Sequence, residues 1–232
     1  MPRITSTGQC NFCNETFSKQ AMTRHLTKCR SQRLPQKGKP RKTFHLLVQG
    51  QYLPEYWLHV EAPASAALQL LDAFLRDIWL ECCGHLSAFT IAGVRYELDT
   101  GGIDAMWSDI FGSPEPTRSM SAHMDSALRP GLKFFHEYDF GTTTTLALKV
   151  VAEQEGVLPK NTINILARNH PPPIPCGKCG QPATDVCAEC MDSPDGWLCE
   201  SHAAKHKHDE MFLPVVNSPR VGQCGYTGGS VN

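Results

Sequence analysis

The segment 65–80, SAALQLLDAFLRDIWL, carries the clearest helical period in the chain and decides its fold class. Its apolar side chains recur at intervals of three and four residues, which places them on one face of a helix. Ser65 is suited to cap the start of this helix, and Gly84 is suited to end it. We therefore expect a helix over 65–80 with one buried face. That face consists of Leu68, Leu71, Leu75, Ile78 and Trp79.

Strand patterns lie on both sides of this helix. Turn residues (Gly50, Pro54 and Gly93) separate several of them, and the β-branched run 142–145, TTTT, favours a strand over a helix. The expected strands are 43–48, 56–61, 86–92, 94–98, 132–140, 143–152 and 161–167. Two strands, a helix and then mostly strands predict an α+β domain, with the helix packed on a mixed or antiparallel sheet.

The stretch Phe135 to Gly141, which contains Tyr138-Asp139-Phe140-Gly141, follows the helix. It is the last in a series of short segments along the chain. The earlier segments are Tyr56-Trp57-Leu58, 68–79, His85-Leu86, Phe89, Gly93 and Tyr96. Together they cover about 110 residues and resemble a bacterial family named for a third open reading frame on an Ri plasmid, also found as a passenger in insertion elements. The resemblance implies an α+β fold, and it implies no defined activity.

Acid–base candidates in this middle region are few. After the glycine the family typically has an acid, a Trp and a His, whereas this chain has Thr142, Thr144 and Leu146, so a family site that uses that acid and His is not expected. The remaining titratable groups are Glu137, Asp139, His136, His85 and His123. We expect Asp139 to cap the turn at Gly141, Glu137 to be solvated and His85 to be structural. Cys82 and Cys83, which follow an apolar helix, are expected to be core thiols.

The first metal pattern is Cys10-x2-Cys13-x11-His25-x3-Cys29. Two cysteines separated by two residues fit one tight turn on a tetrahedral ion, and a His and a Cys four positions apart share a helix face. Phe17 and Met22 lie where a small metal-built module needs core residues, and Ser18 can cap the helix. The segment resembles the Cys-Cys-His-His zinc finger in a Cys-Cys-His-Cys form, which implies a zinc site at 8–30.

If this finger docks in a DNA groove as its relatives do, Ser18, Ala21 and Arg24 face the bases, and only Arg24 is a strong base reader. The basic linker that follows can add phosphate contacts, which give affinity without sequence preference. The expected nucleic-acid residues are Lys19, Arg24, Lys28, Arg30, Arg33, Lys37, Lys39, Arg41 and Lys42. A finger that binds protein instead is an equal alternative.

The second metal pattern is Cys176-x2-Cys179-x7-Cys187-x2-Cys190-x8-Cys199-x2-His202-x3-His206-x1-His208, which supplies ligands for two four-coordinate ions. It resembles a B-box-type cross-brace, in which alternate pairs share a metal. The resemblance implies Cys176, Cys179, Cys199 and His202 at one site, and Cys187, Cys190, His206 and His208 at the other. Asp209 is an alternative ligand for either of the last two histidines. With four protein ligands at each site, structural zinc and a protein-binding surface are expected.

Charge is divided unevenly along the chain. The net charge is −1, but residues 1–42 contain ten Lys and Arg and a single acid, Glu15, whereas residues 43–232 contain twelve Lys and Arg and twenty-two Asp and Glu. A basic arm of this kind favours DNA or RNA as its partner. The expected organisation is a finger at 8–30, a separating basic linker at 31–42, the α+β domain at 43–170, a Pro-rich hinge at 171–175, the double-zinc module at 176–210 and a disordered tail at 215–232.

The eleven cysteines, with neither an apolar N-terminal signal nor an apolar spanning segment, predict a cytoplasmic protein without membrane contact, whose thiols bind metal. The leading hypothesis is a non-enzymatic protein with three zinc ions that associates with nucleic acid through 1–42 and with a protein through 176–210. The alternatives are a protein-interaction adaptor without nucleic-acid binding, and an enzyme of unknown reaction in the middle domain.

Overall fold

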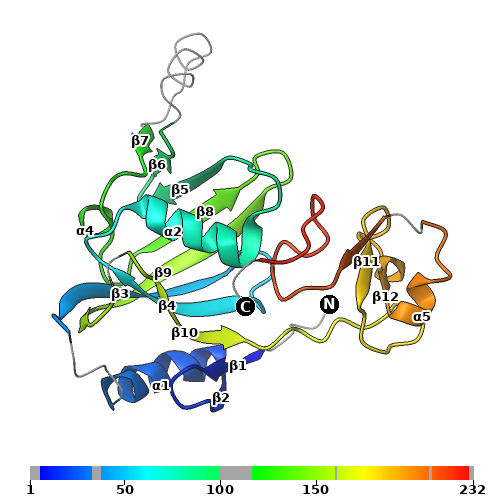
Figure 1. Cartoon of the computed structure of the whole chain (residues 1–232), viewed down its shortest axis with the longest axis horizontal. Coiled ribbons are helices and arrows are strands. Elements are labelled where there is room, and N and C mark those ends of the chain that lie inside the picture. The colour runs from blue at the N-terminus through cyan, green and yellow to red at the C-terminus, as the bar shows by residue number, and fades with distance from the viewer. Residues whose placement is uncertain (1–5, 33–37, 100–116, 160, 209–210, 230–232) are drawn as a thin grey trace, which may run out of the picture.

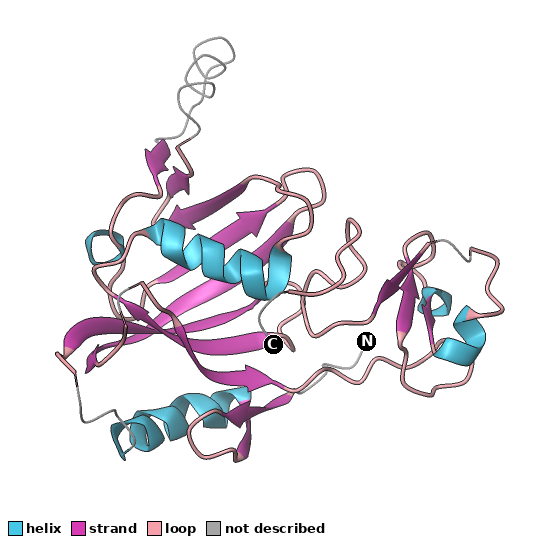
Figure 2. Ribbon diagram, viewed as in Figure 1, coloured by secondary structure: helices cyan, strands magenta, loops and turns pink. Residues whose placement is uncertain are grey.

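The computed structural model describes residues 6–32, 38–99, 117–159, 161–208 and 211–229 (Figure 1). It is a mixed α/β structure in which one large mixed sheet dominates and helices are few (Figure 2). The spatial order of its strands is β2-β1-β10-β4-β3-β9-β8-β5-β6-β7, and every neighbouring pair is antiparallel except β6 and β7. The strands are β1 (Thr7–Cys10), β2 (Thr16–Ser18), β3 (Arg41–Gly50), β4 (Trp57–Pro63), β5 (Ser87–Ile91), β6 (Val94–Glu97), β7 (Thr117–Ser119), β8 (Lys133–Tyr138), β9 (Thr144–Gly156) and β10 (Asn164–Asn169).

The expected helix begins three residues late, as α2 (Leu68–Leu75), and continues as a π-helical turn, η1 (Arg76–Leu80). Ser65 does not cap it as expected, because Ala67 occupies the cap position and no side chain bonds the first turn. All five side chains of its expected apolar face are buried in the main core. A short helix, α4 (Met124–Ala127), adds Met124 to the same core. Because side chains alternate along a strand, Phe44, Leu46 and Val48 of β3 point into this core from the sheet.

Helix α1 (Lys19–Gln32) lies over the other face of the sheet, at the β10 end (Figure 1). Met22 and Leu26 of α1 pack on Trp57 of β4 and on Leu166 and Ala167 of β10 in a second buried cluster. Strand β4 is therefore buried on both faces, from Trp57 to Pro63.

The N-terminal segment continues the sheet and does not form a separate lobe. Gly8 of β1 pairs with Asn169 of β10, and a Cβ at Gly8 would collide with the Arg168 carbonyl oxygen and the Trp57 ring. The expected linker is also shorter, because α1 runs to Gln32 and β3 begins at Arg41. The expectation that this linker separates finger and body is therefore wrong: edge pairing and apolar packing join them.

A polar layer lies between α1 and the sheet. The His45 and His59 rings are 2.8 Å apart (Nε2 to Nδ1), and His59 Nε2 lies 3.3 Å from Thr23 Oγ1 of α1. Arg30 of α1 forms a buried ion pair with Glu61. Burial lowers the pKa of His45 to about 4 and that of His59 to about 3, so both rings are neutral in the folded protein at pH 7.

We expect this layer to make stability depend on pH. Below pH 6.5 the unfolded chain binds protons on His45 and His59 and the folded chain does not, so stability is full above pH 6.5 and falls as pH drops toward 4. At pH 5 the loss is about 1–2 kcal/mol for each ring.

Urea unfolding at pH 7, 6 and 5 measures this loss in His45→Gln and in the matched control His123→Gln, which replaces an exposed histidine. Both variants keep the candidate metal ligands, so the effect of pH on metal binding is the same in each. The difference between their pH dependences of stability therefore reports on His45. The pH dependence of stability is expected to be shallower in His45→Gln, and identical dependences in the two variants would contradict the burial argument.

The C-terminal region contains a small antiparallel sheet in the order β12-β11-β13. Its elements are β11 (Asp185–Cys187), η2 (Pro194–Gly196), β12 (Trp197–Leu198), α5 (Glu200–Ala203) and β13 (Phe212–Pro214). Val186 of β11 belongs to the same buried cluster as α2. Residues 171–175, expected to be a hinge, contain no helix or strand beyond an isolated bridge from Pro175 to Pro182.

The tail 215–229 packs against the body, so the expectation of disorder is wrong for this part. The Trp79 indole donates a hydrogen bond to the Asn217 carbonyl, and the Ser218 hydroxyl donates to the Trp79 carbonyl. Arg220 is fully buried and binds Asp139 at 2.7 Å. The Gly- and Ser-rich composition that suggested disorder here serves tight turns and close backbone contacts, such as that of Gly229 on the end of η1.

None of the helices in the described ranges combines the length and apolar composition needed to cross a lipid bilayer.

Candidate metal centres

The N-terminal cluster brings together Cys10, Cys13, His25 and Cys29, whose ligand atoms all lie within 4.8 Å of one another. Cys10 ends β1, and the turn to β2 carries Cys13 and reverses at Asn14, whose φ is 63°. The Cys13 sulfur lies 3.3 Å from His25 Nε2, and the Cys10 and Cys29 sulfurs are 4.0 Å apart. The four predicted residues therefore converge on one point.

Local sequence explains how α1 presents its two ligands. The Ser18 hydroxyl accepts a hydrogen bond from the Ala21 N–H at 3.4 Å, which caps the start of the helix as expected. Phe17 stacks on the His25 ring at 4.1 Å and fixes its orientation. His25 and Cys29 are one turn apart and project together.

The second cluster contains Cys176, Cys179, Cys199 and His202. The Cys179 and Cys199 sulfurs are 3.8 Å apart, and His202 Nδ1 lies 3.2 Å from the Cys199 sulfur and 3.6 Å from that of Cys176. Gly180, with φ of 74°, closes the turn that brings Cys176 and Cys179 together. Cys199 precedes α5, which supplies His202.

The third cluster contains Cys187, Cys190, His206 and His208. His208 Nδ1 lies 3.5 Å from the Cys187 sulfur and 3.4 Å from the Cys190 sulfur. The alternative ligand Asp209 lies outside the described residues. The pairs of cysteines thus alternate between the second and third clusters along the chain.

The donor sets of these clusters fit a zinc ion. Each offers four sulfur or imidazole nitrogen atoms, the ligand types and number of a structural zinc site. Among the described residues, none is a hydrogen-bond partner of the buried His206 Nε2, a situation that metal binding by the ring would explain. All eleven cysteines are free, so none is committed to a disulfide.

A fourth cluster was not expected from the sequence. Cys82, Cys83, His85 and Cys224 also place their ligand atoms within 4.8 Å of one another. Cys82 is half-buried and packs against the main core, whereas Cys83 and Cys224 are exposed, so the assignment of Cys83 to the core is wrong. The spacing Cys-Cys-x-His was a visible signal, but Cys224 lies in the tail, 141 positions beyond Cys83.

The predicted nucleic-acid residues divide into two groups. Arg30 is buried against Glu61, and Lys19 donates to the Gln49 side chain at 2.7 Å, so both are used inside the protein. Assigning Arg30 to a nucleic-acid surface is wrong, because its charge is paired in the polar layer. The exposed members are Arg24, Lys28, Lys39, Arg41 and Lys42; Arg33 and Lys37 lie outside the described residues.

The acid–base candidates of the middle region have separate partners. Asp139 accepts hydrogen bonds from the N–H groups of Gly141 and Thr142, as expected for a turn cap. Glu137 pairs with Arg95 at 3.3 Å, and buried His136 binds Asp72 at 2.7 Å. Asp139 Oδ2 also lies 3.5 Å from His85 Nε2, whereas Glu137 pairs with Arg95, so the structure does not join Glu137 and Asp139 with one histidine.

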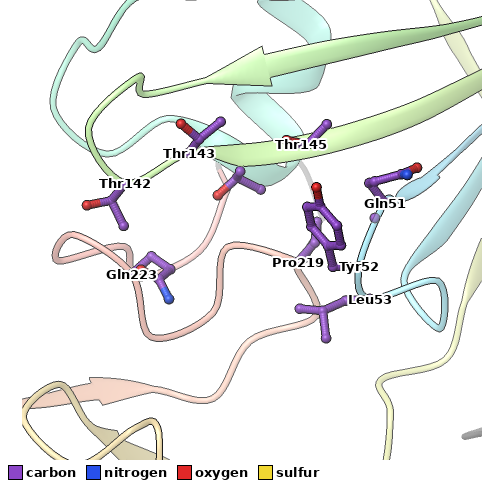
Figure 3. A pocket seen from close by; sticks show the side chains of 10 residues that line it. Gln51, Tyr52, Leu53, Thr142, Thr143, Thr145, Pro219 and Gln223 are labelled. Carbon is purple, nitrogen blue, oxygen red and sulfur yellow. The ribbon is translucent and has the colours of Figure 1, made fainter.

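A pocket of about 290 Å³ lies where the tail passes the β8–β9 turn (Figure 3). Figure 3 shows Pro219 and Gln223 of the tail on one side and Thr142, Thr143 and Thr145 on the other. The described residues that line this pocket include no carboxylate, histidine or cysteine. They offer hydroxyl groups, among them the Tyr52 phenol, and amide groups.

Comparison with known proteins gives no family. No family model matches the chain, and no curated protein matches it. Among solved structures, a protein of unknown function from Methanosarcina mazei Go1 is similar over 56% of this chain and 70% of its own, with 14% identity and a TM-score of 0.42.

Proposed function

We propose that this is a zinc-structured, non-enzymatic protein that associates with nucleic acid through its N-terminal helix and the basic segment beyond it. The N-terminal cluster serves as a Cys-Cys-His-Cys finger, and the second and third clusters serve as a cross-brace module for a protein partner. In a reducing compartment such as the cytoplasm, the cysteines would remain available as ligands.

One observation carries the nucleic-acid proposal: the two faces of α1 have different roles. The inner face holds the metal ligands and packs on the sheet, whereas Arg24 and Lys28, one turn apart, are exposed on the outer face. Lys39 and Arg41, at the start of β3, are exposed as well. These cations suit contacts to phosphate groups, because such contacts require exposed positive charge and do not depend on the base sequence.

The metal sites are proposed to be structural. Every cluster offers four protein ligands, which fill a tetrahedral zinc and leave no position for a reactive water. Zinc would hold together segments with little apolar core of their own, such as the turn at 176–180.

We expect at least three zinc ions in each purified chain, one at each predicted cluster. Cys13→Ser, Cys179→Ser and Cys190→Ser should each remove one ion and leave the others, because no ligand is shared between clusters. Elemental analysis of protein prepared without chelator measures this directly. One zinc ion or none in the unsubstituted chain would contradict the proposal.

A protein-interaction adaptor without nucleic-acid binding is the second candidate. The observation that favours it is the pairing of β1 with β10, because the finger then has a structural role as part of the sheet. A hollow of mixed charge on the C-terminal module, with Lys178, Glu189 and Asp195 at its edge, would suit a polar protein surface.

Co-purification of the full chain, with and without nuclease, separates the two candidates. Nucleic acid that is recovered with the chain and lost on nuclease treatment supports the first. The adaptor hypothesis is supported if the untreated sample contains no nucleic acid and a protein partner is still recovered after nuclease treatment.

A further inference from the structure

The cluster of Cys82, Cys83, His85 and Cys224 joins two distant parts of the chain. Its first three residues follow the end of η1, where Gly84, with φ of 79°, reverses the chain and its N–H donates to the Glu81 carboxylate. Cys224 comes from the tail, in a tight loop between Gly222 and Gly225, which both have positive φ. Two independent turns thus direct their ligands to one point.

The distances within the cluster suit a single tetrahedral ion. The sulfur of Cys83 is 3.4 Å from that of Cys82 and 3.8 Å from that of Cys224. His85 Nε2 lies 2.9 Å from the Cys83 sulfur and 3.2 Å from the Cys224 sulfur. A zinc ion with bonds of about 2.3 Å to sulfur and about 2.0 Å to nitrogen sets its ligands roughly 3.5–3.8 Å apart.

The surroundings hold these ligands in place and balance their charge. Arg220 is buried and donates to the Asp139 carboxylate at 2.7 Å and to the Cys82 sulfur at 3.5 Å. The Cys82 N–H donates to the Tyr138 hydroxyl at 3.4 Å. Hydrogen bonds from neighbouring groups to metal ligands orient those ligands, and the guanidinium offsets the negative charge of thiolates.

We propose that Cys82, Cys83, His85 and Cys224 bind a fourth zinc ion, which fastens the C-terminal tail to the end of the helix. Three thiolates and one imidazole favour zinc over oxygen-preferring cations. The ion is structural, because four protein ligands complete its coordination. The proposal does not depend on nucleic-acid binding or on the fate of the other clusters.

The site has a distinct expected property. Cys83 and Cys224 are exposed, whereas Cys10 and Cys29 of the N-terminal cluster are buried. A chelator can therefore reach the fourth ion more directly, and it should leave before the ion of the N-terminal cluster.

The test is the zinc content of the full chain and of three tail variants, measured by elemental analysis under reducing conditions. We expect four ions in the unsubstituted chain, three in Cys224→Ser and four in Cys224→His, which restores a ligand. Gln223→Ala alters the neighbouring tail residue without removing a ligand and should keep four.

Hydrogen exchange of the tail provides a second readout that works even if Cys224→Ser is less stable overall. Amides of 217–229 should exchange faster in Cys224→Ser and after brief chelation of the native chain, while those of β3 and β9 keep their protection. Equal zinc content in Cys224→Ser and in the native chain, or a mass showing a Cys83–Cys224 disulfide in freshly reduced protein, would each overturn the proposal.

Discussion

Cys10→Ser is expected to destabilise the main sheet as well as the N-terminal segment that contains the substitution. Loss of the ligand should release the metal, and a module this small has little else to hold α1 against the turn. Release of α1 and β1 would expose Trp57, Leu166 and Ala167 and leave Arg30 and Glu61 unpaired. Burying one large apolar side chain contributes about 1.5–3 kcal/mol, so a total loss of about 4–5 kcal/mol is expected.

Thermal unfolding followed by circular dichroism measures this effect. For a chain of this size, a loss of about 4–5 kcal/mol lowers Tm by roughly 10–15 °C. Gly8→Val provides an independent variant, because it keeps all four ligands but places side-chain atoms where the Arg168 carbonyl lies. It should also lower Tm while leaving the zinc content unchanged.

Cys179→Ser is the matched control, since it removes a ligand from a cluster that lies outside the ten-stranded sheet. It should loosen the C-terminal region and leave protection of β1 and β10 intact. An unchanged Tm and unchanged β10 protection in Cys10→Ser would show that docking of the finger contributes nothing to the sheet.

Binding to duplex DNA is expected to weaken by roughly 100- to 200-fold between 50 and 200 mM salt. Two of the cations expected at this surface, Lys19 and Arg30, are used inside the protein. If about four of the remaining cations meet phosphates, the log–log salt slope is about −3.6. The same slope on unrelated sequences would show that contacts to phosphate dominate.

Fluorescence anisotropy with labelled duplexes and the full chain measures this slope. Replacing Arg24, Lys28, Lys39 and Arg41 with Ala should abolish most of the affinity and flatten the slope toward zero. Lys133→Ala with Lys149→Ala is the matched control, because these exposed cations pair across β8 and β9, outside the strands β4 and β10 on which α1 packs. Equal losses in both variants, or no binding at 50 mM salt, would favour the adaptor.

The sequence predicted the local structure well, because each signal lay within one short segment. The helical period of 65–80 and the strand patterns at 43–48 and 132–140 recur in α2 with η1, β3 and β8. The three metal patterns also converge as expected, since close spacing constrains their ligands.

The errors involve contacts between segments far apart in the chain. Strand β1, TGQC, has no apolar alternation, so nothing in it indicated that it pairs with β10. Arg30 stands in a basic run and looks solvated, but its partner Glu61 is a strand residue 31 positions away. Cys224 stands alone in a Gly-rich tail, and only the fold brings it to Cys83 and His85.

The pairing of β1 with β10 also fixes the order in which the nascent protein can assemble. Gly8 leaves the ribosome about 160 residues before its partner Asn169, an interval of roughly 8–30 s at ordinary rates of synthesis. The four N-terminal ligands span only residues 10–29, so the metal can close this segment at the start of translation. We therefore expect the finger to form first and to dock last, when β10 pairs with both β4 and β1.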